Sequence, residues 1–123
     1  EGIHARYIRL TITEIPYHAT PCISGLRVFG KGDGDLPHQA SNVTAVRTDD
    51  MSMQINWQGN ALGYEVLWGH TPEKLYHSYR IFAQTQLAVR ALMANVEQYY
   101  VRIDSFNENG ITEGETCPVI FHK

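Results

Sequence analysis

The stretch from residue 99 to residue 110 constrains the fold of this chain more than any other. Its first part alternates between two sets of residues, which is the pattern of a β-strand with one buried face. One side carries Tyr99, Val101, Ile103 and Ser105, and the other carries Tyr100, Arg102 and Asp104. The stretch ends in Asn107-Glu108-Asn109-Gly110, residue types that turn the chain. The sequence therefore predicts a strand that leads into a tight turn.

Tyr99 opens this strand, a short turn after Leu92. An apolar residue, a turn and a Tyr at the start of a strand are typical of the tyrosine corner of antiparallel sandwiches. We therefore expect the Tyr99 hydroxyl to bond to backbone between Leu92 and Val96. The alternative is that Tyr99 is only a large core residue.

Short strands at regular spacing follow one another from Pro37 onward, with no competing helical period. The predicted strands are 43–48, 51–57, 64–68, 75–82, 86–92, 99–107 and 115–121. Pro118 lacks an N–H donor and marks the last strand as an edge or a bulge. The residues expected to be buried together between two sheets are Trp57, Tyr64, Val66, Leu87 or Val89, Tyr99, Val101 and Ile103. The prediction is an all-β, seven-stranded immunoglobulin-like sandwich.

Residues 1–34 form a separate unit in this interpretation. Apolar residues alternate along Tyr7–Thr13 and Ile23–Phe29, so we expect two strands that pair as an antiparallel hairpin. A hairpin alone is only marginally stable, so we also expect it to dock against the sandwich or against a second copy of the chain and to bury Ile8, Leu10, Ile12 and Val28. Lys31–Pro37 is rich in Gly and Asp and reads as a linker, which places the second domain at 35–123.

Composition excludes several classes of function. The 123 residues carry a net charge of −3 with no basic run, which argues against nucleic-acid binding. No apolar run is long enough to span a bilayer. The residues that could ligate a metal are scattered, so we expect neither a metal nor another cofactor. Cys22 and Cys117 are expected to be two independent thiols, with a disulfide as the alternative.

No motif of a catalytic nucleophile or a phosphate loop occurs in the sequence. The acidic residues fall in turns, where carboxylates are usually solvated, so we expect no catalytic site in this chain. Aromatic residues outside the inward phase are the candidates for contact with a carbohydrate or a protein partner: Tyr76, Tyr100, Phe106 and Tyr17. A rigid exposed ring can stack on the apolar face of a sugar, but it can equally cover a sheet edge or pack on a neighbouring domain.

Residues 37–121 resemble a fibronectin type III domain. The resemblance rests on Trp57, on Tyr64-Glu65-Val66 and on the stretch 99–110. It departs from the family pattern between Leu92 and Tyr99, where the interval is one residue longer and the usual Pro is missing. The loop Asn107 to Glu113 lacks Arg-Gly-Asp, so integrin-type adhesion is not implied.

The first unit is similar to the closing strands of discoidin-like jelly rolls, on the residues 5–10 and 23–30. The order of the two units resembles the C-terminal region of family 43 glycoside hydrolases of gut Bacteroidetes, which are xylosidase- or arabinosidase-like. Glu1 is not an initiator Met, so we expect a piece of a longer protein.

The resemblance implies a non-catalytic accessory or spacer module from the C-terminus of an exported carbohydrate-active enzyme. Its partners would be an upstream catalytic domain of the same polypeptide and a plant-type polysaccharide, in the periplasm, at the outer membrane or outside the cell. The alternatives are a carbohydrate-binding module with an exposed aromatic site, and an adhesion or protein-interaction module.

Overall fold

The computed structural model describes residues 2–121, and the chain divides into two units, Glu1–Gly30 and Lys31–Lys123. The second unit thus begins at Lys31, a few residues before Asp35, where the sequence placed the domain start.

The first unit contains no β-strand among its described residues, 2–30. Its regular element is the short 3-10 helix η1 (Pro16–His18). The predicted strands Tyr7–Thr13 and Ile23–Phe29, and the hairpin that joins them, are therefore wrong. The burial predicted for Ile8, Leu10, Ile12 and Val28 is wrong as well, because these side chains are between 44% and 62% exposed. A pair of strands has no second sheet to cover its apolar face. An alternating pattern by itself therefore does not make a two-stranded hairpin stable.

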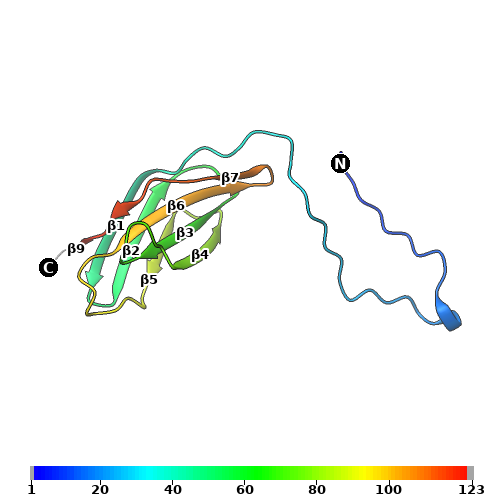
Figure 1. Cartoon of the computed structure of the whole chain (residues 1–123), viewed down its shortest axis with the longest axis horizontal. Helices are drawn as coiled ribbons and strands as arrows, with labels where there is room; N and C mark the ends of the chain where they lie inside the picture. The colour runs from blue at the N-terminus through cyan, green and yellow to red at the C-terminus, as the bar shows by residue number, and fades with distance from the viewer. Residues whose placement is uncertain (1, 122–123) are drawn as a thin grey trace. The chain divides into compact units, whose positions relative to one another are not determined.

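The second unit is a sandwich of two sheets (Figure 1). One sheet has the strand order β5-β2-β1-β9, and the other has the order β4-β3-β6-β7, with β8 paired to β6. The strands are β1 (Ser41–Asp49), β2 (Ser52–Gln58), β3 (Gly63–Gly69), β4 (His77–Phe82), β5 (Gln86–Val89), β6 (Tyr100–Asn107), β7 (Gly110–Thr112), β8 (Cys117–Pro118) and β9 (Ile120–Phe121). The predicted all-β sandwich is confirmed. The extra strands arise because β7 follows the turn at Gly110 and the predicted strand 115–121 is split.

The split falls at Pro118, where the sequence predicted an edge or a bulge. β8 pairs with β6 in one sheet, whereas β9 runs parallel to β1 in the other. Pro118 has no N–H to donate, and the next residue, Val119, donates its N–H to the Tyr99 carbonyl at 2.8 Å. The last strand therefore changes sheets at this point.

The core lies between the two sheets and contains the predicted residues. Trp57, Tyr64, Val66, Val89, Tyr99, Val101 and Ile103 are all buried, and Leu87 packs against them while half-buried. The Trp57 and Tyr64 rings meet edge to face, with centroids 5.4 Å apart. The alternation along the strands thus predicted which face is buried.

The tyrosine corner is present. The Met93 N–H donates to the Tyr99 hydroxyl oxygen at 2.8 Å, inside the predicted interval from Leu92 to Val96. The additional residue in this turn therefore leaves the motif intact.

Arg47 supports the same turn from β1. Its side chain is only 5% exposed, and its guanidinium donates to the carbonyls of Val96, Met93 and Asp50. The guanidinium also lies over the Tyr99 ring, 5.3 Å from the centroid. One buried cation thus joins β1 to the turn that precedes β6.

Candidate functional site

The four aromatic residues proposed from the sequence belong to both units, Tyr17 to the first and the other three to the second. Tyr17 lies in η1 of the first unit and is 98% exposed. Tyr76 precedes β4 and is 68% exposed. Tyr100 and Phe106 are half-buried and lie near opposite ends of β6, about 20 Å apart at ~3.3 Å per residue. Tyr100 and Phe106 therefore do not form one aromatic platform.

Phe106 has a clear packing role on the outer face of its sheet. Its ring meets Phe82 edge to face at 5.4 Å, and Arg80 lies over it at 5.0 Å. Gly63 lies between the two rings in the register, and a Cβ at Gly63 would come within 2.4 Å of the Phe106 ring. Arg80 is in turn paired with Glu65 at 2.9 Å. Phe106 therefore covers a glycine, which is the packing alternative that the sequence left open.

Asp104 is a buried carboxylate that the sequence placed on the outward face. It accepts two bonds from Arg102, at 2.8 and 2.9 Å, and one from the Gly114 N–H at 3.0 Å. The same pairing raises the pKa of the Arg102 guanidinium, chiefly through the hydrogen bond to Asp104. The Asp104 oxygens are engaged in these structural hydrogen bonds, so this pair is not a candidate acid or base.

The segment 32–37 is bonded to the turn between β6 and β7, an arrangement that we call the clasp. Asn107 and Asn109 provide most of its side-chain groups. Its five hydrogen bonds run from Gly32 N–H to the Glu108 carbonyl (2.9 Å), from Gly34 N–H to Asn109 Oδ1 (3.0 Å), from Asn107 Nδ2 and Asn109 Nδ2 to the Asp35 carbonyl (3.0 and 2.9 Å), and from Thr112 Oγ1 to the Pro37 carbonyl (2.6 Å). The segment read as a linker is therefore part of the folded unit.

Glycine is required in the clasp because the Asn109 amide comes very close to the backbone. A Cβ at Gly32 would lie 1.9 Å from Asn109 Oδ1, and one at Gly34 would lie 2.8 Å from Asn109 Nδ2. The sequence signal was available in the Gly-Asp-Gly and Asn-Glu-Asn-Gly clusters, but each was read as an isolated turn or linker. Nothing in local patterning shows that two turns bond to each other.

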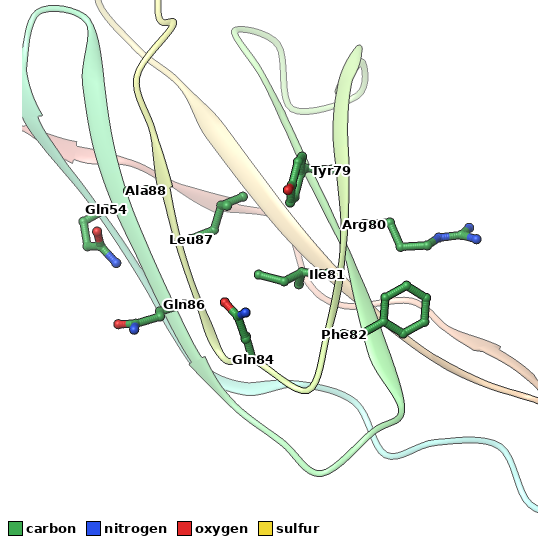
Figure 2. A pocket seen from close by; sticks show the side chains of 9 residues that line it. All are labelled: Gln54, Tyr79, Arg80, Ile81, Phe82, Gln84, Gln86, Leu87 and Ala88. Carbon is green, nitrogen blue, oxygen red and sulfur yellow. The ribbon is translucent and has the colours of Figure 1, made fainter.

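A groove of about 520 Å³ lies beside β4 and β5 (Figure 2). Both are edge strands, since β4 pairs with β3 alone and β5 with β2 alone. In Figure 2, Ile81 and Leu87 point toward each other across the groove, whereas Arg80 and Phe82 point away from it. The lining consists of Gln54, Tyr79, Arg80, Ile81, Phe82, Gln84, Gln86, Leu87 and Ala88. None of the four aromatic residues proposed from the sequence belongs to it.

Two further properties bear on chemistry. In the part of the chain that the structure describes, no group of three or more His, Cys, Asp or Glu side chains could hold a metal ion. No helix among residues 2–121 is long and apolar enough to cross a membrane. Cys22 and Cys117 are both free, and Cys117 is half-buried.

Comparison with solved structures finds the same sandwich in fibronectin type III domains. A Fn3-like protein from Clostridium thermocellum has a TM-score of 0.61 and 14% identity, covering 71% of this chain and 95% of that one. The sixth such domain of human fibronectin type III domain containing protein 3 gives 0.60 and 16%, covering 74% and 91%. The domain of the human collagen alpha-1(XX) chain gives 0.54 and 17%, covering 76% and 95%.

These similarities define the fold. The second unit has the fibronectin type III fold. No protein-family model matches the sequence, and no curated protein matches it either.

Proposed function

We propose that residues 31–121 act as a non-catalytic spacer that holds neighbouring parts of a longer polypeptide in a fixed direction. The observation that carries this proposal is the position of the two points where the chain enters and leaves the sandwich. The chain enters at the clasp, against the β6–β7 turn, and β9 leaves beside the far end of β1, where Phe121 pairs with Arg47 (Figure 1). A module connected at opposite ends sets a distance between its neighbours.

The distance follows from strand geometry. Glu108 accepts from Gly32 in the clasp and Tyr99 accepts from Val119 next to β9, and these two residues flank β6, nine positions apart, so the two points lie about 30 Å apart at ~3.3 Å per residue. The clasp adds direction, because its hydrogen bonds fix the Gly34 N–H and the Asp35 carbonyl of the entering segment against Asn107 and Asn109. A flexible Gly-rich linker would leave that direction free.

We further propose that the longer polypeptide is an exported carbohydrate-active enzyme, xylosidase- or arabinosidase-like, with its catalytic domain upstream. This proposal rests on the sequence resemblance of residues 5–10, 23–30 and 99–110. In that setting the spacer would hold the catalytic domain relative to polysaccharide, to a partner or to the cell envelope.

Pulsed dipolar electron paramagnetic resonance, which measures the distance between two spin labels, tests the proposed spacer role. The labels are placed at Lys31→Cys and Ile120→Cys in a chain in which Cys22 and Cys117 are replaced by Ser. We expect one narrow distance distribution centred near ~30 Å, broadened by the span of the labels themselves. Asn107→Ala combined with Asn109→Ala should widen it, because the clasp then loses its side-chain bonds.

The matched control is Asn42→Ala, whose amide bonds to Gln58 outside the clasp at 2.7 Å. The control should leave the distribution narrow. A distribution that is already broad in the parent chain would contradict the spacer, whatever the identity of the longer protein.

A further inference from the structure

β4 is the longest free edge of the sandwich. Among the strands that the structure describes, the edge strands are β4 with six residues, β5 with four, β7 with three, and β8 and β9 with two each. β4 pairs with β3 from His77 to Phe82 in unbroken register and contains no Pro. Alternate residues of such a strand turn their N–H and C=O groups away from the sheet, where another strand can pair with them.

The charge that could protect this edge is directed back over the sheet. Arg80 is the one Lys, Arg, Asp or Glu residue in β4. Its guanidinium pairs with Glu65 of β3 at 2.9 Å and lies over the Phe106 ring of β6, 5.0 Å from the centroid. Edge strands are commonly protected by Pro, by a bulge or by a charge that projects at the edge. β4, which the structure describes in full, has none of these, so its backbone is open to pairing.

Backbone groups border the groove beside β4 and β5. Arg80 and Phe82 belong to its lining although their side chains point away from it (Figure 2), so they border it through their backbone. On β5, Gln86 and Ala88 are placed in the same way, because Leu87 between them faces the core. The groove thus runs between the backbones of two edge strands, one from each sheet.

Between these backbones the groove has an apolar floor. Ile81 and Leu87 point toward each other across it (Figure 2), and Tyr79 lies on the same face of β4 as Ile81. Tyr79 is 54% exposed although it is in register with the fully buried Val66, so the sandwich is open at this flank. A strand added to β4 would point alternate side chains into this opening, which has a volume of about 520 Å³.

We propose that the β4 edge binds an extended peptide of another protein, about six residues long, with apolar side chains at alternate positions. The peptide backbone bonds to the free groups of β4, and its apolar side chains cover Tyr79, Ile81 and Leu87. Six residues span about 20 Å at ~3.3 Å per residue, which is the length of β4. The inference goes beyond the spacer role and does not depend on it.

A second copy of the chain, paired through its own β4, is the competing occupant. Edge-to-edge contact would cover a strip about 20 Å long and ~10 Å wide, the spacing of two packed sheets, which is roughly 200 Å² per partner. A stable dimer buries about 800 Å² per partner. A single strand is narrow enough to enter the groove and to contact β4 and β5 together, so the geometry favours a peptide.

Amide NMR of the full chain tests the proposal. The probes are three acetylated peptides in which valine, isoleucine or tyrosine alternates with threonine over six residues before a closing lysine. With at least one of them we expect saturable shifts along β4 and at Leu87. We also expect slower hydrogen exchange at alternate β4 amides, those that β3 leaves unpaired.

Two N-methylated forms of the binding peptide separate backbone pairing from general apolar contact. A strand paired at an edge uses only alternate N–H groups. Methylation of one alternate set should therefore weaken binding at least about tenfold, and methylation of the other set should leave it nearly unchanged.

Tyr79→Lys tests the same edge from the protein side. It points a charge into the opening, so it should weaken binding by a similar factor. Tyr76→Lys is the matched control, because Tyr76 is an exposed tyrosine outside β4 that does not line the groove. Thermal unfolding of both variants shows that the fold is retained.

Four results would overturn the proposal. The first is no saturable shift with any of the three peptides, and the second is a set of shifts that maps away from β4 and β5. The third is an equal effect of the two methylated sets. The fourth is protection of β4 amides that grows with protein concentration in the absence of peptide, which would assign the edge to a second copy. None of these bears on the label distances that test the spacer, so the two proposals fail separately.

Discussion

Two residues hold the turn that precedes β6, Arg47 from β1 and Tyr99 from the position just before β6. Tyr99 accepts from the Met93 N–H, and Arg47 donates to the carbonyls of Met93 and Val96. The guanidinium also lies over the Phe121 ring, 5.5 Å from its centroid. Arg47 therefore connects the tyrosine corner to the strand by which the chain leaves the sandwich.

Arg47→Met keeps most of the apolar stem and removes the guanidinium. The carbonyls of Met93, Val96 and Asp50 then lose their charged donor in a partly buried site. We expect the free energy of unfolding to fall by at least about 2 kcal/mol in urea denaturation. Arg90→Met, at an exposed arginine, is the control and should cost little. Equal losses in the two variants would remove the role given to Arg47.

Tyr99→Phe tests the corner itself. The ring stays in the core, but the Met93 N–H loses its acceptor. We expect the free energy of unfolding to fall by about 1–2 kcal/mol, more if no water replaces the hydroxyl. Tyr76→Phe at an exposed site serves as the comparison and should be close to neutral. A neutral Tyr99→Phe would show that the corner bond contributes nothing.

The Cys117 thiol gives the fold a pH dependence. Burial raises its pKa, and the Glu115 carboxylate adds to this rise. Because the folded state then holds the proton more tightly than the unfolded state, stability is level below the usual thiol pKa of about 8.5 and falls as pH rises above it. Cys117→Ala should reduce this alkaline loss in urea denaturation under reducing conditions, and Cys22→Ala should not. Identical slopes above that pH in the parent and Cys117→Ala would contradict it.

The sequence predicted the structural role of Tyr99 in this turn and missed that of Arg47. Tyr99 carries a local signal, an apolar residue and a turn before a strand. Arg47 carried a weaker one, since it falls in the same phase as Val43 and Ala45, but a charged residue is normally assigned to the surface. Two of its three carbonyl partners, Met93 and Val96, lie more than forty positions away in sequence, so the local pattern did not indicate that its charge would be satisfied.

At the scale of elements, one glycine in β3 allows side chains and backbone of the neighbouring strands β4 and β6 to pack closely against it. Gly63 lies between Phe82 and Phe106 in the register, and a Cβ there would come within 2.4 Å of the Phe106 ring and 2.8 Å of the Ile81 carbonyl oxygen. The carbonyl belongs to the backbone of β4, which cannot move aside without disturbing the pairing. A glycine in a strand often marks a position where neighbouring groups come close to the backbone, and Gly63 is such a position.

Gly63→Ala should therefore lower the free energy of unfolding by about 1–3 kcal/mol, the usual cost of forcing atoms into a packed site. Gly30→Ala is the control, because no heavy atom lies within 4 Å of a Cβ added there. The measurement is urea denaturation of both variants. A neutral Gly63→Ala would mean that Phe106 moves aside freely and does not hold the outer face of β6.

The predicted strands agree with the structure where a second sheet covers their apolar face, and they are wrong where no second sheet does so. Strands β1 to β6 alternate, and each finds a partner sheet across the core. The segments Tyr7–Thr13 and Ile23–Phe29 alternate equally well, but their side chains are exposed and form no ladder. Alternation indicates that a segment can form a strand with one apolar face, but it does not show that a second sheet is present to cover that face. The groove was missed for a related reason, since its lining comes from both sheets and the loop between them.

At the scale of the whole molecule, the sequence predicted the sandwich and misjudged where it begins. Trp57, Tyr64 and the alternation of β6 were sufficient for the fold because they lie in its core. The clasp joins residues more than seventy positions apart, for example Gly34 and Asn109. Contacts of that separation leave no periodic signal, and a cluster of Gly and Asp has the composition of a linker whether or not it is bonded.

In the proposed spacer, residues 32–36 are a rigid part of the sandwich and give the chain a fixed direction at that end. Backbone ¹⁵N relaxation of the full chain tests it most directly. We expect order parameters for these residues near ~0.85, as in the strands, and a fall toward ~0.6 or below when Asn107→Ala and Asn109→Ala are combined. Order parameters already below ~0.6 in the parent chain would contradict the clasp, and with it the spacer.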